Sequence, residues 1–552
     1  MPVININRDV FEKYVGKKLP TDKLKDRISY FGTDLEEVTD DEITVEIFPN
    51  RPDMLSVQGF GRAFSSFLGV NTGLRNYPIK KSSEKMIVDS SVADVRPYTA
   101  CCIVKNLKFD DEKIKEVIEI QEKLHITYGR NRKKVAIGIY PFEKIKMPIT
   151  FTAEDPKKIV FRPLEAAGEM NALEILEKHP AGKTYGYLLE GKKKFPVFRE
   201  ANGEVLSLPP IINSHTTGKV SESTTEVFIE CSGFDFEVMK KCLNMIVAAL
   251  SEMGGDVYSM ELDYGKKKFV TPDMNPEEMT VDFDYINKLL GLELKEKEFK
   301  ELFERMGYGY KNKKVQVPAY RADILHQADL AEDISIAFGF ENFEAIIPDV
   351  ATTGEEDPFA VFKGKVVQLL VGLGFLQTST YNLTNVDTQF KKMNVEMDYV
   401  QLANPISSDY DVLRAWMLPS VIGVLGDNKH NEFPQKVFSI GTVFSKDKSM
   451  ETGVKEQERI AIAISSEDTD YTDIRQVFDY LLANLGLEGS VKETKHDSFI
   501  SGRVGRGSVS GKEIAYIGEI NPLVLENWEL DTPVTALELN LSELFEIVKK
   551  NN

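Results

Sequence analysis

An internal repeat limits the folds open to this chain more than any other property of its sequence. Residues 10–69 and 285–339 carry apolar residues and glycines at the same spacings. In the first copy these are Val10, Tyr14, Gly16, Leu19, Leu24, Ile28, Phe31 and Gly32, and in the second they are Tyr285, Leu289, Gly291, Leu294, Phe299, Phe303, Met306 and Gly307. Each copy predicts two helices that stop at a glycine, then a strand and a final helix. The chain therefore holds one folding module twice.

The copies also share a turn after the predicted strand, which covers residues 43–48 in the first copy and 315–318 in the second. The sequence RPD at 51–53 follows one strand, and RAD at 321–323 follows the other. The final helix differs in charge, because the second copy has Asp329, Glu332 and Asp333 where the first has Gly59, Arg62 and Ala63. The module therefore does not need acids at these positions in order to fold.

The acids of the second copy form a candidate metal site. Positions i, i+3 and i+4 share one face of a helix that is predicted to start near Gln327. Carboxylates gathered without a basic neighbour repel one another, and Mg²⁺ or Ca²⁺ bound by oxygen ligands removes that repulsion. The alternative is that acids stabilise the helix start through its dipole. We expect His326 to cap the helix or lie on the surface. The predicted ligands are Asp323, Asp329, Glu332 and Asp333.

The composition is typical of a globular protein of roughly three or four domains, with 42% apolar and 28% charged residues in 552. No run of ~20 apolar residues predicts a membrane span, and the N-terminus has no signal-peptide pattern. The cysteines fit neither a disulfide framework nor a metal knuckle, so we expect them to be buried in a cytoplasmic protein. They are Cys101, Cys102, Cys231 and Cys242.

The formal net charge of −19 argues against a surface that coats nucleic acid, so any RNA contact should be local or shared with a partner. Common catalytic motifs are missing. The chain has neither an HExxH helix nor a GxSxG turn. Gly182-Lys183-Thr184 resembles the end of a phosphate-binding loop, but a helix-like stretch precedes it and the earlier glycine is absent.

Segments along the whole chain form an ordered set of motifs that resembles one known family. They are IFPNRPD at 47–53, VAIGIY at 135–140, PPIINS at 209–214, YRAD at 320–323, DLAEDI at 329–334, NPIS at 404–407, FSIGTVF at 438–444 and IGEINP at 517–522. In this order they resemble the β subunits of phenylalanyl-tRNA synthetase, in the compact archaeal and eukaryotic form. The resemblance implies an α₂β₂ enzyme that uses ATP to ligate phenylalanine to its tRNA, with synthesis on the α subunit. It also implies that Mg²⁺ at the acidic cluster helps to organise the assembly.

The resemblance implies an editing domain at residues 76–265, which would hydrolyse tyrosyl-tRNA. A synthetic pocket rejects an added hydroxyl poorly, so a second hydrolytic site is needed. The candidate residues are Ser214, Asp235 and Asn213. The alternative is structural: Asn213 and Ser214 are common in turns, and Asp235 can cap the next helix near Glu237. We expect His215 to be exposed.

We therefore predict an α+β multi-domain chain with a duplicated helix–strand–helix module, an α/β editing domain and a class II synthetase-like antiparallel sheet domain. The expected boundaries are 1–75 and 272–347 for the modules, 76–265 for editing and 355–552 for the last domain. That domain lacks the arginines that adenylation needs to hold ATP phosphates, so we expect it to be non-catalytic. The competing hypotheses are a free-standing aminoacyl-tRNA deacylase and a scaffold with decayed sites.

Overall fold

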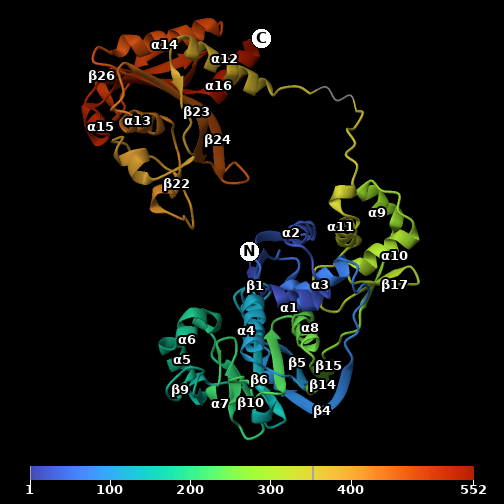
Figure 1. The fold of residues 1–552 in the computed structure, drawn as a ribbon. Helices are drawn as coiled ribbons and strands as arrows, with labels where there is room; N and C mark the ends of the chain where they lie inside the picture. Colours follow the sequence, from blue (N-terminus) through green and yellow to red (C-terminus); the bar gives the residue numbers. More distant parts are fainter. Residues whose placement is uncertain (1, 351–353, 552) are drawn as a thin grey trace. The chain divides into compact units, whose positions relative to one another are not determined.

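The computed structural model describes residues 2–350 and 354–551. The chain divides into two units, Met1–Ile347 and Pro348–Asn552 (Figure 1). Helices and several separate sheets are mixed in both, so the prediction of an α+β multi-domain chain is confirmed.

The first module is a three-stranded sheet covered by three helices. Its sheet has the order β1-β3-β2, with strands β1 (Val3–Asn7), β2 (Asp34–Val38) and β3 (Glu42–Glu46). The helices are α1 (Arg8–Val15), α2 (Thr21–Tyr30) and α3 (Val57–Phe67). Helix α1 stops at Gly16, whose φ of 76° suits glycine. The rings of Phe11, Phe31, Phe60 and Phe64 pack together between the helices.

The second module repeats this topology. Its sheet has the order β16-β18-β17, with strands β16 (Glu277–Thr280), β17 (Gly309–Lys311) and β18 (Lys314–Val317). The helices are α9 (Phe283–Leu290), α10 (Glu296–Arg305) and α11 (Gln327–Phe338). Helix α9 ends at Gly291 with a φ of 69°, as α1 ends at Gly16. The sequence pattern missed β2, β16 and β17, because these strands are short and bury few side chains.

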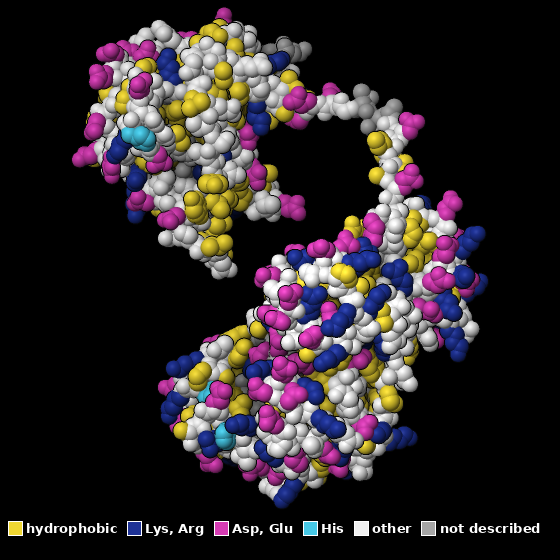
Figure 2. Space-filling view, in the orientation of Figure 1, with side chains coloured by type: hydrophobic (Ala, Val, Ile, Leu, Met, Phe, Trp, Pro, Cys, Tyr) yellow, Lys and Arg dark blue, Asp and Glu magenta, His cyan; other side chains and the backbone are white. Residues whose placement is uncertain are grey.

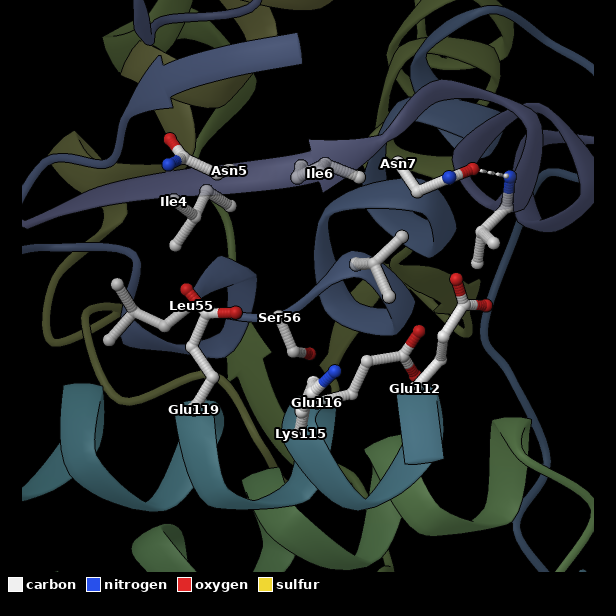
Figure 3. A pocket seen from close by; sticks show the side chains of 12 residues that line it. Ile4, Asn5, Ile6, Asn7, Leu55, Ser56, Glu112, Lys115, Glu116 and Glu119 are labelled. Atoms are coloured by element: carbon white, nitrogen blue, oxygen red, sulfur yellow. Dashed lines mark hydrogen bonds between the residues drawn. The ribbon is translucent and has the colours of Figure 1, made fainter. Parts of the chain in front are cut away.

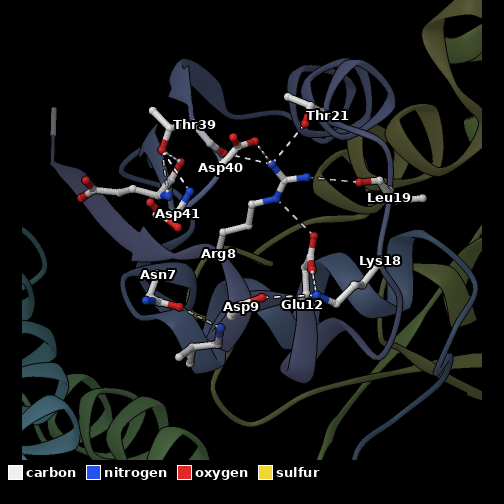
Figure 4. A network of polar contacts seen from close by, with 12 residues as sticks. Asn7, Arg8, Asp9, Glu12, Lys18, Leu19, Thr21, Thr39, Asp40 and Asp41 are labelled. Atoms are coloured by element: carbon white, nitrogen blue, oxygen red, sulfur yellow. Dashed lines mark hydrogen bonds and ion pairs between the residues drawn. The ribbon is translucent and has the colours of Figure 1, made fainter.

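Arg8 ties the parts of the first module together at the point where β1 becomes α1 (Figure 4). Its guanidinium donates to the Glu12 carboxylate at 3.2 Å, to the Thr21 hydroxyl at 3.1 Å and to the Thr39 carbonyl at 3.0 Å. These acceptors belong to α1, α2 and the β2–β3 turn, so one charged side chain fixes their relative positions.

Between the modules in sequence lies a ten-stranded sheet of order β12-β11-β10-β7-β4-β14-β5-β13-β6, with β15 paired to β14. Its strands are β4 (Ile79–Val88), β5 (Tyr98–Lys105), β6 (Val135–Pro141), β7 (Ile149–Glu154), β10 (Phe195–Arg199), β11 (Val205–Leu208), β12 (Ile212–Asn213), β13 (Val227–Gly233), β14 (Asp256–Asp263) and β15 (Lys268–Thr271). Cys101 and Cys102 point to opposite faces of β5, because they belong to different hydrophobic clusters. The same segment of the chain also contains the short elements β8 (Val160–Phe161), β9 (Met170–Asn171), α5 (Ala172–Lys178), α6 (Pro180–Tyr185) and α7 (His215–Gly218).

Two long helices cover the central strands of this sheet. Helix α8 (Phe236–Glu252) packs on β5 and β13, and α4 (Asp111–Ile126) packs on β6 and α8 (Figure 1). Helix α8 also contacts both modules. It packs on α3 of the first module, and Asn244 donates to the Ala319 carbonyl of the second at 3.2 Å. Glu252 accepts from Tyr77, just after the first module, at 2.7 Å. One hydrophobic cluster therefore runs through both modules and the sheet face under α8.

The second unit is a seven-stranded sheet of order β19-β23-β24-β28-β27-β26-β25, antiparallel except for the pair β19–β23. The strands are β19 (Leu376–Gln377), β23 (Gln435–Lys446), β24 (Val454–Ser465), β25 (Gly489–Glu493), β26 (Phe499–Val509), β27 (Lys512–Ile520) and β28 (Val534–Asn540). Residues alternate between the faces: Ile460 and Ile462 join one cluster, and Ala461 and Ala463 join the other.

Helices cover both faces of this sheet. The cluster containing Ile460 includes α12 (Pro358–Gly372), α14 (Tyr471–Asn484) and α16 (Leu541–Asn551). The opposite cluster includes α13 (Leu418–Asp427) and α15 (Pro522–Asn527). The second unit also contains a small sheet of order β20-β22-β21, formed by β20 (Leu383–Thr384), β21 (Val400–Gln401) and β22 (Val412–Leu413).

In the described part of the chain, no helix combines the length and apolar character needed to cross a membrane. The four cysteines are free and buried, as expected from their number and spacing. Gly182-Lys183-Thr184 lies within helix α6, without the strand and loop that phosphate binding requires.

Candidate functional site

A cavity of about 740 Å³ opens between α4, β6, the β11–β12 turn and α7. Apolar side chains of α4 and β6 form much of its wall, among them Val117, Ile137 and Ile139. Polar groups from separate strands meet in it. Strands β6 and β11 lie near opposite ends of the strand order, yet the Tyr140 hydroxyl of β6 lies 2.8 Å from Ser207 Oγ of β11. Such a concave, largely apolar site with a few polar groups is typical of small-molecule binding.

Glu230 is the least expected of the polar groups that line the cavity, because it lies on the fully buried strand β13. Gly138 faces it on β6, and a side chain there would collide with Glu230 Oε1 and Tyr140 Oη. The glycine is therefore needed to admit both side chains. The sequence held a signal for this in VAIGIY, where one glycine interrupts an apolar strand.

The Tyr140 hydroxyl lies 2.8 Å from Ser207 Oγ, 3.2 Å from Glu230 Oε1 and 3.4 Å from Asn213 Oδ1. Its single proton can serve only one of these acceptors at a time. Glu230 Oε2 is buried and has no hydrogen-bond partner among the described residues. A buried oxygen left unpaired in this way is costly unless a ligand or water satisfies it.

The charge of Glu230 is set by competing effects. Burial raises the pKa of its carboxyl to about 8, although the buried Arg96 and the hydroxyls of Tyr140 and Ser232 favour the charged form. The Arg96 guanidinium donates to Ser232 two residues along β13. Near pH 7 the carboxyl is therefore largely protonated, and Glu230 can both donate and accept a hydrogen bond.

The structure separates the three residues predicted for editing. Asn213 lines the cavity and approaches Tyr140. Ser214 is buried, does not line the cavity and caps α7, where its hydroxyl accepts from the Thr216 amide at 3.3 Å. Asp235 does not line the cavity either. It caps α8 by accepting from the Glu237 amide at 3.0 Å. These contacts agree with the structural alternative, in which Ser214 belongs to a turn and Asp235 caps a helix.

His215 was expected to be exposed, and this expectation is wrong. The ring is half-buried and lines the cavity, and Nδ1 is buried with no partner among the described residues. The reason is tertiary, because the turn after β12 folds back on the sheet and turns α7 toward β6.

The acidic cluster of the second module differs from the prediction in one respect. We expected the carboxylates to lack a basic neighbour, but the buried Arg321 lies between two of them. Its Nη2 is 2.7 Å from Asp323 Oδ2 and 2.8 Å from Asp333 Oδ2. The Tyr308 hydroxyl also donates to Asp333. The physical reason is that the RAD turn folds its arginine back under α11, which the spacing along one helix could not reveal.

The other two acids are arranged differently. Asp329 accepts hydrogen bonds from the amides of Leu325 and His326 at 2.7 and 2.8 Å, at the start of α11. His326 is the N-cap of that helix, as expected. Glu332 is exposed, and its carboxylate has no hydrogen-bond or ion-pair partner in the described part of the chain. Its pKa is raised by partial burial and by the three other carboxylates of the cluster.

These four acids do not form a ready metal site in this arrangement. Among the described residues, no group of three acidic, histidine or cysteine side chains is positioned to hold a metal ion. Two carboxylates bind Arg321 and a third binds backbone amides, which leaves Glu332 as the free oxygen donor. Metal binding at this cluster therefore stays a prediction.

The RPD turn of the first module forms the same arginine–aspartate pair as the RAD turn of the second, although its final helix lacks the acids of the second module. Arg51 donates to both oxygens of Asp53, at 2.9 and 3.0 Å, as Arg321 does to Asp323. The Arg62 guanidinium lies 4.1 Å from the ring of Tyr320 in the other module. The pKa of Asp53 is lowered to about 2, because Arg51, Arg321 and Arg62 outweigh the effect of burial. The two turns thus meet in one buried charge network between the modules.

A smaller cavity of about 220 Å³ lies between the first module and α4 (Figure 3). Asn5 and Asn7 of β1 line one side, and Glu112, Glu116 and Glu119 of α4 line the other. Gln58 is fully buried and donates to Glu116 at 2.5 Å. This cavity belongs to the contact between the module and α4 and is separate from the cavity around Glu230.

Comparison with known proteins finds similar sequences along the whole chain. Family models match at residues 1–70 (Phe-tRNA synthetase beta subunit B1 domain), 279–340 (tRNA synthetase B5 domain) and 344–541 (phenylalanyl tRNA synthetase beta chain CLM domain). The phenylalanine–tRNA ligase beta subunit of Pyrococcus abyssi is 40% identical over 99% of this chain and 100% of its own length. That of Archaeoglobus fulgidus is 38% identical over 99% of both chains.

A solved structure agrees with this result. A crystal structure of an N-terminal fragment of the phenylalanyl-tRNA synthetase beta subunit from Pyrococcus horikoshii matches with a TM-score of 0.58 and 38% identity. It covers 61% of this chain and 99% of the fragment. The family matches in the two modules and the last domain occur in the order that the sequence motifs predicted. The chain therefore belongs to the phenylalanine–tRNA ligase β subunit family.

Proposed function

We propose that this chain is the β partner in a phenylalanine–tRNA ligase and that a separate α subunit attaches phenylalanine to tRNA with ATP. The observation that carries this proposal is the match of essentially the whole chain to β subunits of that ligase. An α₂β₂ assembly is the expected stoichiometry. A free-standing deacylase would not need the second unit, and a decayed scaffold would not need a cavity with a buried carboxyl in its wall.

The test is to purify this chain with and without a co-expressed α subunit and to measure phenylalanine- and ATP-dependent adenylate formation. We expect adenylate only with α. Adenylate formed by the pure chain would refute the assignment of synthesis to α.

We propose further that the cavity around Glu230 removes tyrosine from mischarged tRNA. The support is the unpaired Oε2 of a buried, largely protonated carboxyl inside an apolar cavity. A tyrosyl hydroxyl would satisfy that oxygen, whereas a phenylalanyl ring would leave it buried and unpaired. Sites built to bind a hydroxyl reject the analogue that lacks it, because the buried polar group then stays unsatisfied.

In this proposal the tyrosyl ring lies between the apolar side chains of α4 and β6, with its hydroxyl at Glu230. Asn213 and His215 are among the polar groups that line the same cavity, and they can bind the ester or its attacking water. Ser214 holds the turn that carries them, through its bond to the Thr216 amide. Asp235, the third candidate from the sequence, caps α8 outside this cavity and takes no part in the proposed reaction.

The decisive comparison is deacylation of tyrosyl-tRNA and phenylalanyl-tRNA by wild type, Glu230→Gln and Glu230→Ala. We expect Glu230→Ala to lower tyrosyl-tRNA hydrolysis by about 10- to 100-fold, the loss expected for a hydrogen bond to a buried ionisable group. Phenylalanyl-tRNA hydrolysis should stay low or rise. Glu222→Gln, in an exposed loop before β13, is the matched control. Unchanged tyrosyl-tRNA hydrolysis in Glu230→Ala would refute the role of this carboxyl.

We also propose Mg²⁺ binding at the acidic cluster, with Glu332 as the exposed ligand. The support is the accumulation of negative charge, since the three other acids raise the pKa of Glu332 even with Arg321 present. Calorimetric Mg²⁺ titration of the chain, alone and with α, tests this. We expect Asp329→Ala with Glu332→Ala to weaken metal-dependent assembly, and unchanged metal content and assembly would remove the site.

The second unit offers a surface for the α subunit. Exposed apolar side chains gather near the small sheet, where Ile406, Tyr381 and Tyr410 are all exposed and the two tyrosine rings lie 6.1 Å apart (Figure 2). Contiguous exposed apolar patches of this kind mark protein interfaces. On the face of the first unit seen in Figure 2, by contrast, basic and acidic side chains are interspersed.

A further inference from the structure

A strained turn lies at the edge of the Glu230 cavity. Arg130, Asn131 and Arg132 have φ values of 49°, 53° and 64°, in the left-handed region that non-glycine residues avoid. Three such residues in succession are costly and persist only where the surroundings hold them. The turn follows α4 and leads into β6, and both of these elements line the cavity.

The result of this strained turn is the placement of the Arg132 side chain in the cavity wall. Its Nη1 donates to the Ile211 carbonyl at 2.9 Å and lies 3.4 Å from that of Pro210. Its Nη2 donates to the Glu122 carboxylate on α4 at 3.0 Å. Its guanidinium lies 4.2 Å from the centre of the Tyr185 ring. One planar cation thus connects three segments that are far apart in sequence.

The acceptor on α4 is itself fixed. Glu122 also contacts His125 Nδ1 at 3.1 Å, and His125 Nε2 accepts from the Ile137 amide at 2.8 Å. Because Nε2 is the acceptor, the neutral ring carries its proton on Nδ1 and donates to Glu122. The network therefore runs from β6 through His125 and Glu122 to Arg132 and ends on the turn that leads to Asn213.

We infer that Arg132 is a positioning residue for the hydrolysis of tyrosyl-tRNA: it holds the turn 209–213, and with it Asn213, at the distance from α4 that the substrate requires. This inference rests on the proposed editing function. Lysine cannot replace Arg132, because an ammonium lacks the planar fork that serves a carbonyl and a carboxylate in different directions.

Arg130 provides a matched control, since it lies in the same left-handed turn but is exposed. Arg132→Ala and Arg130→Ala make the same chemical change in the same backbone conformation. Only the first removes the contacts to Ile211 and Glu122. Arg132→Lys is the second variant, which retains the charge if the alanine variant folds poorly.

The first measurement is amide hydrogen exchange of the full chain at residues 211–214. We expect exchange about 10- to 100-fold faster in Arg132→Ala and Arg132→Lys, as for the loss of one charged hydrogen bond, and wild-type exchange in Arg130→Ala. Equal exchange in Arg132→Ala and wild type would overturn the positioning role. This readout does not depend on enzymatic activity.

The second measurement is tyrosyl-tRNA deacylation by the complex with α. We expect kcat to fall on the order of 100-fold in Arg132→Ala with a smaller change in KM, because misplaced groups chiefly slow the chemical step. Added guanidinium at low, non-denaturing concentration should restore part of the rate, which a general loss of stability would not allow. A wild-type protein that does not hydrolyse tyrosyl-tRNA refutes the editing function, and the exchange experiment then still decides the role of Arg132.

Discussion

Replacing Glu230 by glutamine should change how the stability of the first unit depends on pH. Burial raises the pKa of this carboxyl from 4.5 to about 8 in the folded protein. A group with a raised folded-state pKa contributes stability that is fully present below the unfolded pKa and is lost as pH rises through the folded pKa. Glutamine resembles the protonated acid but does not titrate, so Glu230→Gln should escape that loss.

The size of the effect follows from the two pKa values. One proton linked to folding changes the free energy of unfolding by about 1.4 kcal/mol per pH unit. Between pH 5 and pH 8 the stability of Glu230→Gln should therefore rise relative to wild type by a few kcal/mol, on the order of 4 kcal/mol. The difference should be smallest near pH 5, close to the ordinary pKa of 4.5, because the unfolded chain has released least of this proton there.

The assay must report the first unit alone. Both tryptophans, Trp416 and Trp528, lie in the second unit, so tryptophan fluorescence during urea unfolding reports that unit and serves as an internal control. Amide hydrogen exchange of β13 between pH 5 and 8, corrected for intrinsic rates, reports the first. Glu222→Gln should follow wild type at every pH. Parallel curves for Glu230→Gln and wild type would refute the reasoning.

Further predictions concern the charge network, a helix cap and the apolar surface. Arg321→Ala leaves the buried Asp333 and the half-buried Asp323 without their cation and should destabilise the second module by about 3–5 kcal/mol, seen as faster exchange in α11, whereas unchanged protection would count against the network. Asp235→Ala should cost about 0.5–2 kcal/mol at the start of α8 and leave tyrosyl-tRNA hydrolysis at the wild-type rate. A large loss of hydrolysis there would return Asp235 to the site. Tyr381→Ala with Ile406→Ala should weaken association with α in sedimentation without changing deacylation by the β chain, and intact association would exclude this surface.

Much of the architecture could be predicted from spacing. Glycines at positions 16 and 291 end matching helices, as their spacing predicted, because each adopts a positive φ. The start of α11 near Gln327 and the cap at His326 were also predicted correctly. These features are local, since each depends on residues within a few positions of one another.

The candidate sites were predicted less completely. The helical spacing placed three acids on one face of α11, but it could not show that Arg321 returns from the preceding turn to bind Asp323 and Asp333. The motif PPIINS lies on a turn that lines the cavity around Glu230. Glu230 was missed because a lone acid in an apolar strand carries no spacing signal.

The sequence by itself determined the duplicated module, the alternation of buried faces and membership of a family, because these depend on local periodicity and on motifs in order. Only the tertiary structure decided which polar atoms face one another. Glu230, Tyr140 and Asn213 come from three strands, and their meeting depends on the sheet order β6 beside β13 and on the way β11 and β12 turn back. Hydrogen bonds and buried charges act over a few ångströms, so their partners are set by strand order and packing rather than by distance along the chain.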